Sequence, residues 1–388
     1  MKICVLTSSR AEYGLLRKLI LGIKKDKFFN LNLVVAGSHL SKKYGLTISE
    51  IIKDKIKVNK KIFLNLNKSN ASSVNKNFSI INREMGSFFK KKKIDLFLVL
   101  GDRYEVLGGV ISSYIHGIPV AHLHGGEKTL DSLDDSYRHS ISKFSKLHLV
   151  SHKNFRKRLL QLGESKKNIF VVGGLGAHAI NQTIFLKKKD LEKNLKIKFL
   201  EHIIIINFYP EISDLKSSIR KLRKILTTLN NFKNCSLIFT LPSHDIGNDN
   251  FENLIRNFVK KNKNSKVYQN LGHENYLSLV KISSLMIGNS SSGILESPSF
   301  NKFSINIGKR QEGRIFSKSV INIDTNLSKL NIIINSIIKK TRNNNINGKN
   351  NLYFKKNTVA HIIKILKTIK LDNLKKIKNF KDIKFYEH

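Results

Sequence analysis

The residues best suited to chemistry are acids that follow short apolar runs. Asp102 follows Gly101 at the end of Leu96–Leu100, a run with the length of a buried strand, and Arg103 beside it is expected to contact substrate. Glu127 follows a second apolar run and two glycines, and Asp134 opens the next helical pattern. Grouped carboxylates suit acid–base catalysis, because proximity and burial separate their pKa values. In the alternative interpretation, Asp102 and Asp134 cap the helices that follow them.

Two histidines, His122 and His124, lie just before Glu127. A spacing of two places both on one face of a strand, where a pair of imidazoles could bind a metal ion. No third ligand follows at a familiar spacing, so we expect no metal site here.

A segment near the start of the chain could bind an anion. Ser8, Ser9 and Arg10 stand between a predicted strand and a predicted helix. The unpaired amides of a helix start and a guanidinium group both bind phosphate. No G-x-G-x-x-G pattern is present, which argues against a bound dinucleotide. The alternative is that Ser8 or Ser9 caps the helix while Arg10 is solvated.

A similar segment lies in the second half of the chain, where a run of three serines joins a strand to a helix. Hydroxyl groups and amides at such a junction can surround a phosphate, and the serines are Ser290, Ser291 and Ser292. Glu296 lies one turn further on, within reach of a pair of ribose hydroxyls. Arg314, in a basic segment after the next strand, adds a guanidinium group. A capped loop is the alternative.

These candidates are positioned by an alternation of short apolar runs and longer helical patterns. In the first half, strands are expected at 3–6, 31–35, 57–63, 96–100, 120–122, 147–150 and 169–172, and helices at 12–25, 41–53, 74–91, 104–116, 135–146 and 154–162. In the second half, strands are expected at 202–207, 236–240, 266–268, 285–287, 303–307 and 320–323, and helices at 214–230, 251–261, 273–283, 293–297, 327–340 and 358–371.

The strand–helix order predicts two doubly wound α/β domains with parallel sheets. Glycines at 173, 174 and 176 suggest a hinge near residue 175, with a phosphate-binding loop as the alternative. In such sheets ligands bind outside the carboxyl ends of the strands, and in two-domain proteins often between the domains.

The net charge of the chain is typical of proteins that bind nucleic acid or other polyanions. The formal charge of +42 comes from 70 Lys and Arg residues against 28 Asp and Glu residues, a balance typical of nucleic-acid binding. The excess is mostly lysine and is spread over almost every predicted helix. Lys, Asn, Ile and Phe share A/T-rich codons, so base composition is another explanation. We therefore expect a solvated basic coat and no specific nucleic acid, with a functional polyanion surface as the alternative.

Membrane and disulfide proteins are not indicated. No apolar run approaches the ~20 residues that span a bilayer, so no membrane insertion is expected. The first residues are typical of a strand rather than of a signal peptide. Cys4 and Cys235 lie far apart in strand-like contexts, which argues against a disulfide or a thiolate metal site. These features predict a cytoplasmic protein.

With these segments in view, the chain resembles the hydrolysing UDP-N-acetylglucosamine 2-epimerases, which supply precursors of sialic- or legionaminic-type acids. The matching stretches occur in family order over roughly residues 1–315, at 9–14, 101–105, 122–127, 134–139, 288–296 and 306–314. The resemblance implies a glycosyltransferase-B-like fold of two Rossmann-like domains, at 1–175 and 176–355. A C-terminal segment, 356–388, would carry a helix that crosses back onto the first domain.

The resemblance also implies roles for individual residues. Asp102, Glu127 and Asp134 would surround the sugar, and Glu296 would bind the ribose. The residues holding the diphosphate would be Arg10, Ser290, Ser291, Ser292 and Arg314. The family reaction removes the nucleotide by anti elimination across carbons 1 and 2, and the resulting glycal is then hydrated. It needs no cofactor, and no metal is expected.

The chain departs from the family pattern at three places. His124 stands where some relatives carry glutamate, so either His124 or Glu127 would take that catalytic role. Tyr209-Pro210 replaces a His-Pro pair, and Tyr209 would then offer substrate a hydrogen-bond donor. The segment 242–247 differs from a Pro-Asn-x-Asp-x-Gly loop. These changes leave the nucleotide and the sugar open.

The expected activity is therefore conversion of UDP-N-acetylglucosamine and water to N-acetylmannosamine and UDP. The alternatives are the same reaction on a 4-acetamido-4,6-dideoxy UDP- or GDP-sugar, a glycosyltransferase of the same fold, a non-hydrolysing epimerase and a polyanion-binding protein. A nucleotide sugar is the expected partner. A dimer or tetramer of the chain is left open.

Overall fold

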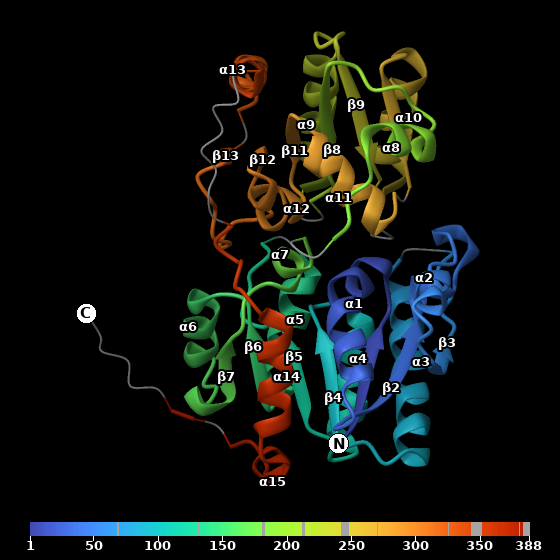
Figure 1. The fold of residues 1–388 in the computed structure, drawn as a ribbon, viewed down its shortest axis with the longest axis vertical. Helices are drawn as coiled ribbons and strands as arrows, with labels where there is room; N and C mark the ends of the chain where they lie inside the picture. Colours follow the sequence, from blue (N-terminus) through green and yellow to red (C-terminus); the bar gives the residue numbers. More distant parts are fainter. Residues whose placement is uncertain are drawn as a thin grey trace. The chain divides into compact units, whose positions relative to one another are not determined.

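The computed structural model describes residues 1–67, 70–130, 132–180, 183–211, 214–241, 248–269, 271–324, 326–342, 351–379 and 381–382. The chain divides into two compact units (Figure 1). Unit 1 comprises Met1–Glu127, Leu133–Ala179 and Lys355–His388, and unit 2 comprises Lys128–Ser132 and Ile180–Phe354.

Unit 1 is built on a seven-stranded sheet with the order β3-β2-β1-β4-β5-β6-β7. All neighbouring strands pair in parallel. The order reverses between β1 and β4, and ligands of doubly wound folds bind at the carboxyl ends of the strands beside such a reversal. The strands are β1 (Lys2–Thr7), β2 (Asn30–Ala36), β3 (Val58–Ile62), β4 (Leu96–Leu100), β5 (Val120–Leu123), β6 (Leu147–Val150) and β7 (Ile169–Val171).

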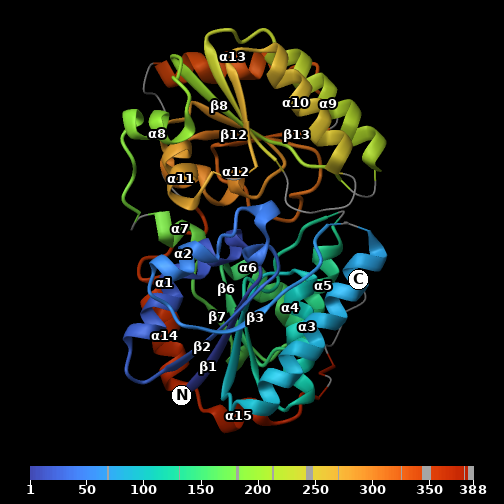
Figure 2. The ribbon, with the colours of Figure 1, turned by 90° about the vertical axis from the view of Figure 1, so that its right-hand side faces the viewer.

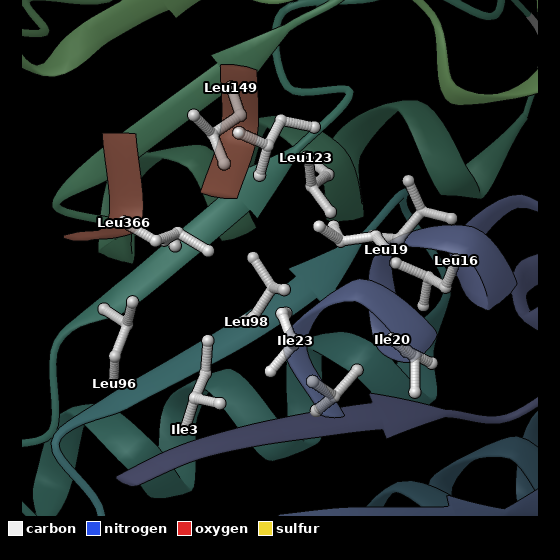
Figure 3. Packing of buried hydrophobic residues seen from close by; sticks show 14 of the residues in the cluster. Ile3, Leu16, Leu19, Ile20, Ile23, Leu96, Leu98, Leu123, Leu149 and Leu366 are labelled. Carbon is white, nitrogen blue, oxygen red and sulfur yellow. The ribbon is translucent and has the colours of Figure 1, made fainter. Parts of the chain in front are cut away.

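Helices cover both faces of this sheet, so its central strands are almost continuously apolar. Successive side chains alternate between two hydrophobic clusters: Ile3 and Leu98 pack on one face, and Cys4 and Phe97 on the other. Figure 3 shows the first cluster. The helices are α1 (Arg10–Lys25), α2 (Ile48–Lys53), α3 (Ala71–Lys91), α4 (Tyr104–Ile115), α5 (Leu133–Phe144), α6 (Lys153–Gln161), α7 (Leu175–Ile180), α14 (Thr358–Thr368) and α15 (Leu371–Lys375).

Helix α14, in the C-terminal segment, belongs to unit 1 and lies beside α1 (Figure 1). Ile362, Ile365 and Leu366 of α14 join the same hydrophobic cluster as Leu19 and Ile23 of α1. The return of the C-terminal helix to the first domain, implied by the family resemblance, is therefore confirmed.

Unit 2 contains a six-stranded parallel sheet in its described residues, with the order β10-β9-β8-β11-β12-β13. One face packs against α9, α10 and α13, and the other against α8 and α11 (Figure 2). The strands are β8 (His202–Asn207), β9 (Cys235–Thr240), β10 (Ser265–Tyr268), β11 (Leu285–Gly288), β12 (Phe303–Ile307) and β13 (Val320–Ile323). The helices are α8 (Lys188–Leu195), α9 (Leu215–Leu229), α10 (Asn248–Lys261), α11 (His273–Ile282), α12 (Ser292–Leu295) and α13 (Leu330–Arg342).

The predicted fold class, two doubly wound α/β domains, is confirmed, and two helix predictions need correction. The helix expected at 41–53 is confirmed only at 48–53, as α2: short 3-10 turns precede it, because Gly45 and Leu46 adopt positive φ angles of 83° and 46°. The helix expected at 293–297 is one turn, α12, followed by a 3-10 helix at Ser297–Phe300 that contains Pro298. The patterns missed α7, α8 and α15.

The segment 242–247 lies outside the described residues. Cys4 and Cys235 are buried free thiols. Within the described ranges, no helix has the length and apolar character needed to cross a membrane.

The contribution of α14 to unit 1 can be measured by shortening one side chain. Ile362 is fully buried, so Ile362→Val is expected to lower the free energy of unfolding by about 1 kcal/mol. Urea unfolding followed by circular dichroism provides the measurement, and Lys364→Ala, exposed on the same helix, is the control. Equal unfolding midpoints for Ile362→Val and the unaltered protein would contradict the packing of α14 on unit 1.

Candidate active site

The first acid of the candidate site, Asp102, is presented by a tight turn at the end of β4. Gly101 has a φ of 83°, a conformation that glycine adopts without strain. Asp102 accepts a hydrogen bond from Arg138 of α5, which is only 2% exposed. Arg138 also contacts Asp135, at 3.2 Å. The capping alternative for Asp102 is wrong, since Arg103 occupies the N-cap position of α4.

His122 holds this turn in place. One ring nitrogen, Nε2, lies 2.8 Å from the carbonyl oxygen of Gly101, and Nδ1 lies 3.0 Å from the hydroxyl of Ser142. Burial lowers the pKa of His122 to about 3, so the ring is neutral. Nε2–H therefore donates to Gly101, and the Ser142 hydroxyl donates to Nδ1. His122 supports the turn that carries Asp102.

His124 and Glu127 form a buried pair after β5. His124 has a φ of 62°, so it leaves the strand and does not share a face with His122, contrary to the expectation from their spacing. Its Nδ1 lies 2.9 Å from Glu127 Oε1, which also accepts from the Ser151 hydroxyl at 2.8 Å. The backbone N–H of Leu175 points to Nε2 at 3.4 Å. Nε2 is thus the acceptor nitrogen, and Nδ1–H donates to Glu127.

The third acid, Asp134, lies in the first turn of α5, which begins at Leu133. The interpretation of Asp134 as an N-cap preceding the helix is therefore wrong. An acid in this turn is favourably placed against the positive end of the helix dipole.

The segment after β1 combines a helix cap with an arginine. Ser9 caps α1 in a reciprocal arrangement with Glu12, as one alternative predicted. Arg10 is not simply solvated: its Nε lies 2.9 Å from a carboxylate oxygen of Glu50, and its side chain is 16% exposed. Arg103, expected to contact substrate, places Nε and one terminal nitrogen 3.2 Å from the two carboxylate oxygens of Glu105.

Glu12 is a buried acid that the motifs did not single out. One carboxylate oxygen, Oε2, accepts from the backbone and hydroxyl of Ser8, at 2.6 and 3.0 Å, and from the backbone of Ser9 at 3.1 Å. Burial raises the pKa of Glu12 to about 7, although Arg103 and the Ser8 amide lower it. The carboxyl group fixes the turn from which Arg10 projects.

In unit 2, a buried asparagine joins the loops that follow three strands. Asn289 exchanges hydrogen bonds of 2.8 Å with the backbone N–H and carbonyl of Tyr209, and its own carbonyl accepts from Gln311 at 2.8 Å. Gly288 precedes it with a φ of 145°, where an added Cβ would lie 2.1 Å from the carbonyl oxygen of Asn207. These contacts hold the segments after β8, β11 and β12 together.

The serine segment is more constrained than its sequence suggests. Ser290 Oγ accepts from the amide of Ser292 at 3.3 Å, while the Ser292 hydroxyl donates to Glu296. The hydroxyl of Tyr276, on α11, lies 2.5 Å from Ser292 Oγ. Burial raises the pKa of Glu296. Because α12 has a single turn, its dipole is small, and any anion binding here depends on the amides and hydroxyls themselves.

The two remaining predicted binding residues, Tyr209 and Arg314, follow β8 and β12 of unit 2. Tyr209 places its hydroxyl 3.2 Å from Thr240 Oγ1. Arg314 lies in the turn after β12, where its backbone N–H donates to the carbonyl of Gln311 at 3.2 Å.

Every predicted residue thus follows a strand or opens a helix on its own unit. In unit 1 these are Arg10, Asp102, Arg103, His124, Glu127 and Asp134, and in unit 2 Tyr209, Ser290, Ser291, Ser292, Glu296 and Arg314. Their roles in binding and catalysis stay predictions. Among the described residues, no group of three or more His, Cys, Asp or Glu side chains is placed to hold a metal ion.

Residues 22–367 match the sequence model of the UDP-N-acetylglucosamine 2-epimerase family. The chain belongs to this family. It is 42% identical over 326 residues to the GDP/UDP-N,N'-diacetylbacillosamine 2-epimerase (hydrolyzing) of Campylobacter jejuni, covering 84% of this chain and 85% of that protein. It is 35% identical over 367 residues to the polysialic acid biosynthesis protein P7 of Escherichia coli, covering 94% and 93%.

Solved structures of other epimerases share the fold. The UDP-GlcNAc 2-epimerase of Neisseria meningitidis bound to UDP-GlcNAc aligns with a TM-score of 0.80 at 17% identity, over 95% of this chain and 100% of that one. The enzyme of Methanocaldococcus jannaschii, in complex with UDP-GlcNAc and UDP, aligns with a TM-score of 0.78 at 18% identity, over 95% and 99%. Family membership makes the chain a nucleotide-sugar 2-epimerase, and these alignments show that it has the two-domain fold of the solved structures.

Proposed function

We propose that this epimerase is a hydrolysing enzyme, which releases the nucleotide and a free 2-epimeric sugar from a nucleotide-linked 2-acetamido sugar. Family membership and the acids Asp102, Glu127 and Asp134 after the strands of unit 1 support the proposal. Two relatives carry the word hydrolyzing in their names, the Campylobacter jejuni protein and a UDP-N,N'-diacetylbacillosamine 2-epimerase of Legionella pneumophila, 31% identical over 333 residues, covering 83% of this chain and 85% of that protein.

The proposed reaction begins with an elimination. A base takes the proton from carbon 2 while the bond between carbon 1 and the diphosphate oxygen breaks, which leaves a glycal and the nucleoside diphosphate. Water then adds its hydroxyl to carbon 1, and carbon 2 receives a proton on the face opposite to the one that was lost. The proton at carbon 2 is not acidic, so its removal must be coupled to departure of the diphosphate.

We assign proton transfer to the residues that follow β4 and β5 and open α5 in unit 1. Loss and return of a proton on opposite faces needs at least two groups that exchange protons, and we assign these steps to the carboxylates of Asp102, Glu127 and Asp134 and to His124. His124 donates to Glu127 through Nδ1, so this pair can hold a proton on either partner. Asp102 is kept in place by Arg138 and by the turn that His122 supports.

We assign nucleotide binding to unit 2. The hydroxyls and amides of Ser290 and Ser291, with the guanidinium of Arg314, would bind the diphosphate and stabilise the charge that develops as it departs. Glu296 would accept hydrogen bonds from the ribose, and Tyr209 would donate one to substrate.

Two candidate substrates are considered, each supported by a different observation. The motifs resemble those of enzymes that act on UDP-N-acetylglucosamine, whereas the name of the 42% identical relative favours a diacetamido sugar linked to UDP or GDP. Incubation with each nucleotide sugar in D₂O, followed by ¹H and ³¹P NMR, separates them. The proposal expects the free 2-epimer with deuterium at carbon 2, together with UDP or GDP. A product that stays linked to the nucleotide, or a requirement for an acceptor, would contradict it.

Arg314 provides a test of the nucleotide assignment. Arg314→Ala is expected to weaken UDP binding by about 1.5–3 kcal/mol, the scale of a hydrogen bond to a charged group. Isothermal titration calorimetry measures the change, and Arg256→Ala, which removes an exposed arginine paired with Glu252, is the control. If both variants bind UDP as the unaltered protein does, Arg314 has no part in the site.

A further inference from the structure

The geometry around Glu296 includes a tyrosine that none of the motifs identified. Tyr276 lies in the first turn of α11, and its hydroxyl is 2.5 Å from Ser292 Oγ. The Ser292 hydroxyl is in turn hydrogen-bonded to Oε2 of Glu296. Three side chains from two separate segments of unit 2 thus form one continuous chain of hydrogen bonds.

The direction of this chain follows from the inventory of donors. While Glu296 is ionised, its oxygens only accept, so the single hydroxyl proton of Ser292 is donated to Glu296. Ser292 Oγ then accepts, and Tyr276 must be the donor. Burial raises the pKa of Tyr276 well above its usual value, and the nearby Glu296 and Tyr209 raise it further. Tyr276 therefore keeps its proton and can act only as a donor to Ser292.

Glu296 needs such support because the backbone gives it little. It stands between the one-turn helix α12 and the 3-10 helix that begins at Ser297, with φ of −108° and ψ of −49°. No continuing α-helix fixes the direction of its side chain. Within the described part of the chain, only Ser292 donates a hydrogen bond to the Glu296 carboxylate. The other oxygen, Oε1, is left to accept from a ligand.

We propose that Tyr276 is a positioning residue that determines nucleotide specificity, because it orients Glu296 through Ser292 for binding the ribose hydroxyls. This inference rests on the proposed role of Glu296 in nucleotide binding. Each of the two ribose hydroxyls can donate one hydrogen bond to the Glu296 carboxylate, while the Ser292 hydroxyl holds Oε2 in place. The hydrogen-bond chain would therefore favour ribonucleotides over 2′-deoxyribonucleotides.

The test compares UDP and GDP with their 2′-deoxy analogues by calorimetry. The unaltered protein is expected to bind the better ribonucleoside diphosphate ~10–100-fold more tightly than its deoxy analogue, as expected for a hydrogen bond to a charged group. Tyr276→Phe keeps the ring and removes the donor. It should weaken ribonucleotide binding ~5–10-fold, leave the deoxynucleotide unchanged and so reduce the discrimination by the same factor.

Two further variants separate positioning from simple packing. Ser292→Ala removes the middle hydroxyl of the hydrogen-bond chain. The double variant Ser292→Ala with Tyr276→Phe should show the same ratio of ribonucleotide to 2′-deoxynucleotide affinity as Ser292→Ala alone, because the two residues act in series. Tyr268→Phe is the matched control: it removes a tyrosine hydroxyl that donates to the Leu195 carbonyl at 2.6 Å, elsewhere in unit 2, and should leave both affinities unchanged.

Each outcome decides the inference. Equal weakening of both ligands by Tyr276→Phe would show a role in packing alone and overturn the proposal. Unaltered discrimination in Tyr276→Phe would overturn it while leaving the ribose contact of Glu296 intact. Absence of discrimination in the unaltered protein would overturn both the ribose contact and the inference, whereas hydrolysing epimerase activity would still be judged by the NMR assay.

Discussion

Asp102→Asn is expected to lower kcat/KM for the nucleotide sugar by at least ~100-fold, the usual scale for losing an acid–base group. Asparagine can still accept a hydrogen bond from Arg138, so the turn after β4 and the affinity for UDP should be preserved. The side chain can no longer take up or release a proton. Steady-state turnover, UDP calorimetry and thermal unfolding measure these three properties separately.

The matched control for this prediction is Asp135→Asn. Asp135 is the second carboxylate in contact with Arg138, at 3.2 Å, and lies one residue beyond Asp134 in the same helix. Turnover of this variant should fall only a few-fold. A loss of activity equal to that of Asp102→Asn would assign both acids to the support of Arg138. Near-normal turnover of Asp102→Asn would remove Asp102 from the chemistry.

Glu127→Gln is expected to reduce turnover by a similar factor, at least ~100-fold, because the amide cannot hold the proton that the His124–Glu127 pair would exchange. Ser151→Ala is the control, since it removes the hydrogen bond from the Ser151 hydroxyl to Glu127 Oε1 but keeps the carboxylate. Its turnover should fall by less than ~10-fold.

His124→Gln distinguishes the two members of the pair. If Glu127 is the group that reacts and His124 only positions it, His124→Gln should retain a measurable rate that Glu127→Gln lacks. The opposite order would give the reacting role to His124. Comparable activity of Glu127→Gln and the unaltered protein would exclude the pair from proton transfer.

Most strands could be predicted from the sequence, because a buried parallel strand is a short apolar run between polar segments. The helix expected at 41–53 was predicted too long at its start, for a local reason. Its apolar spacing fits a helix, but Gly45 and the following Leu46 adopt left-handed conformations that end the turn before α2 begins. The single turn of α12 is explained by Pro298, which is compatible only with the start of the following 3-10 helix.

The sequence positions of the candidate site residues could be predicted, whereas their hydrogen-bond partners could not. A polar residue just after an apolar run, such as Asp102 after Gly101, indicates the carboxyl end of a parallel strand. Its pairing with Arg138 depends on how α5 packs beside β4, which no local pattern records. The same holds for Asn289, whose bonds to Tyr209 span 80 residues, and for Tyr276, which reaches Ser292 from another helix.

The return of α14 to unit 1 has a consequence for biosynthesis. The hydrophobic face of α1 is covered by residues that leave the ribosome some 340 positions later, after all of unit 2 has been made. Unit 2 is almost continuous in sequence, so it can finish folding while unit 1 still exposes Leu19, Ile23 and their neighbours. A chain that stops before α14 would keep this apolar surface open to aggregation. Synthesis of α14 is thus the step after which the apolar face of α1 can be buried in the newly made protein.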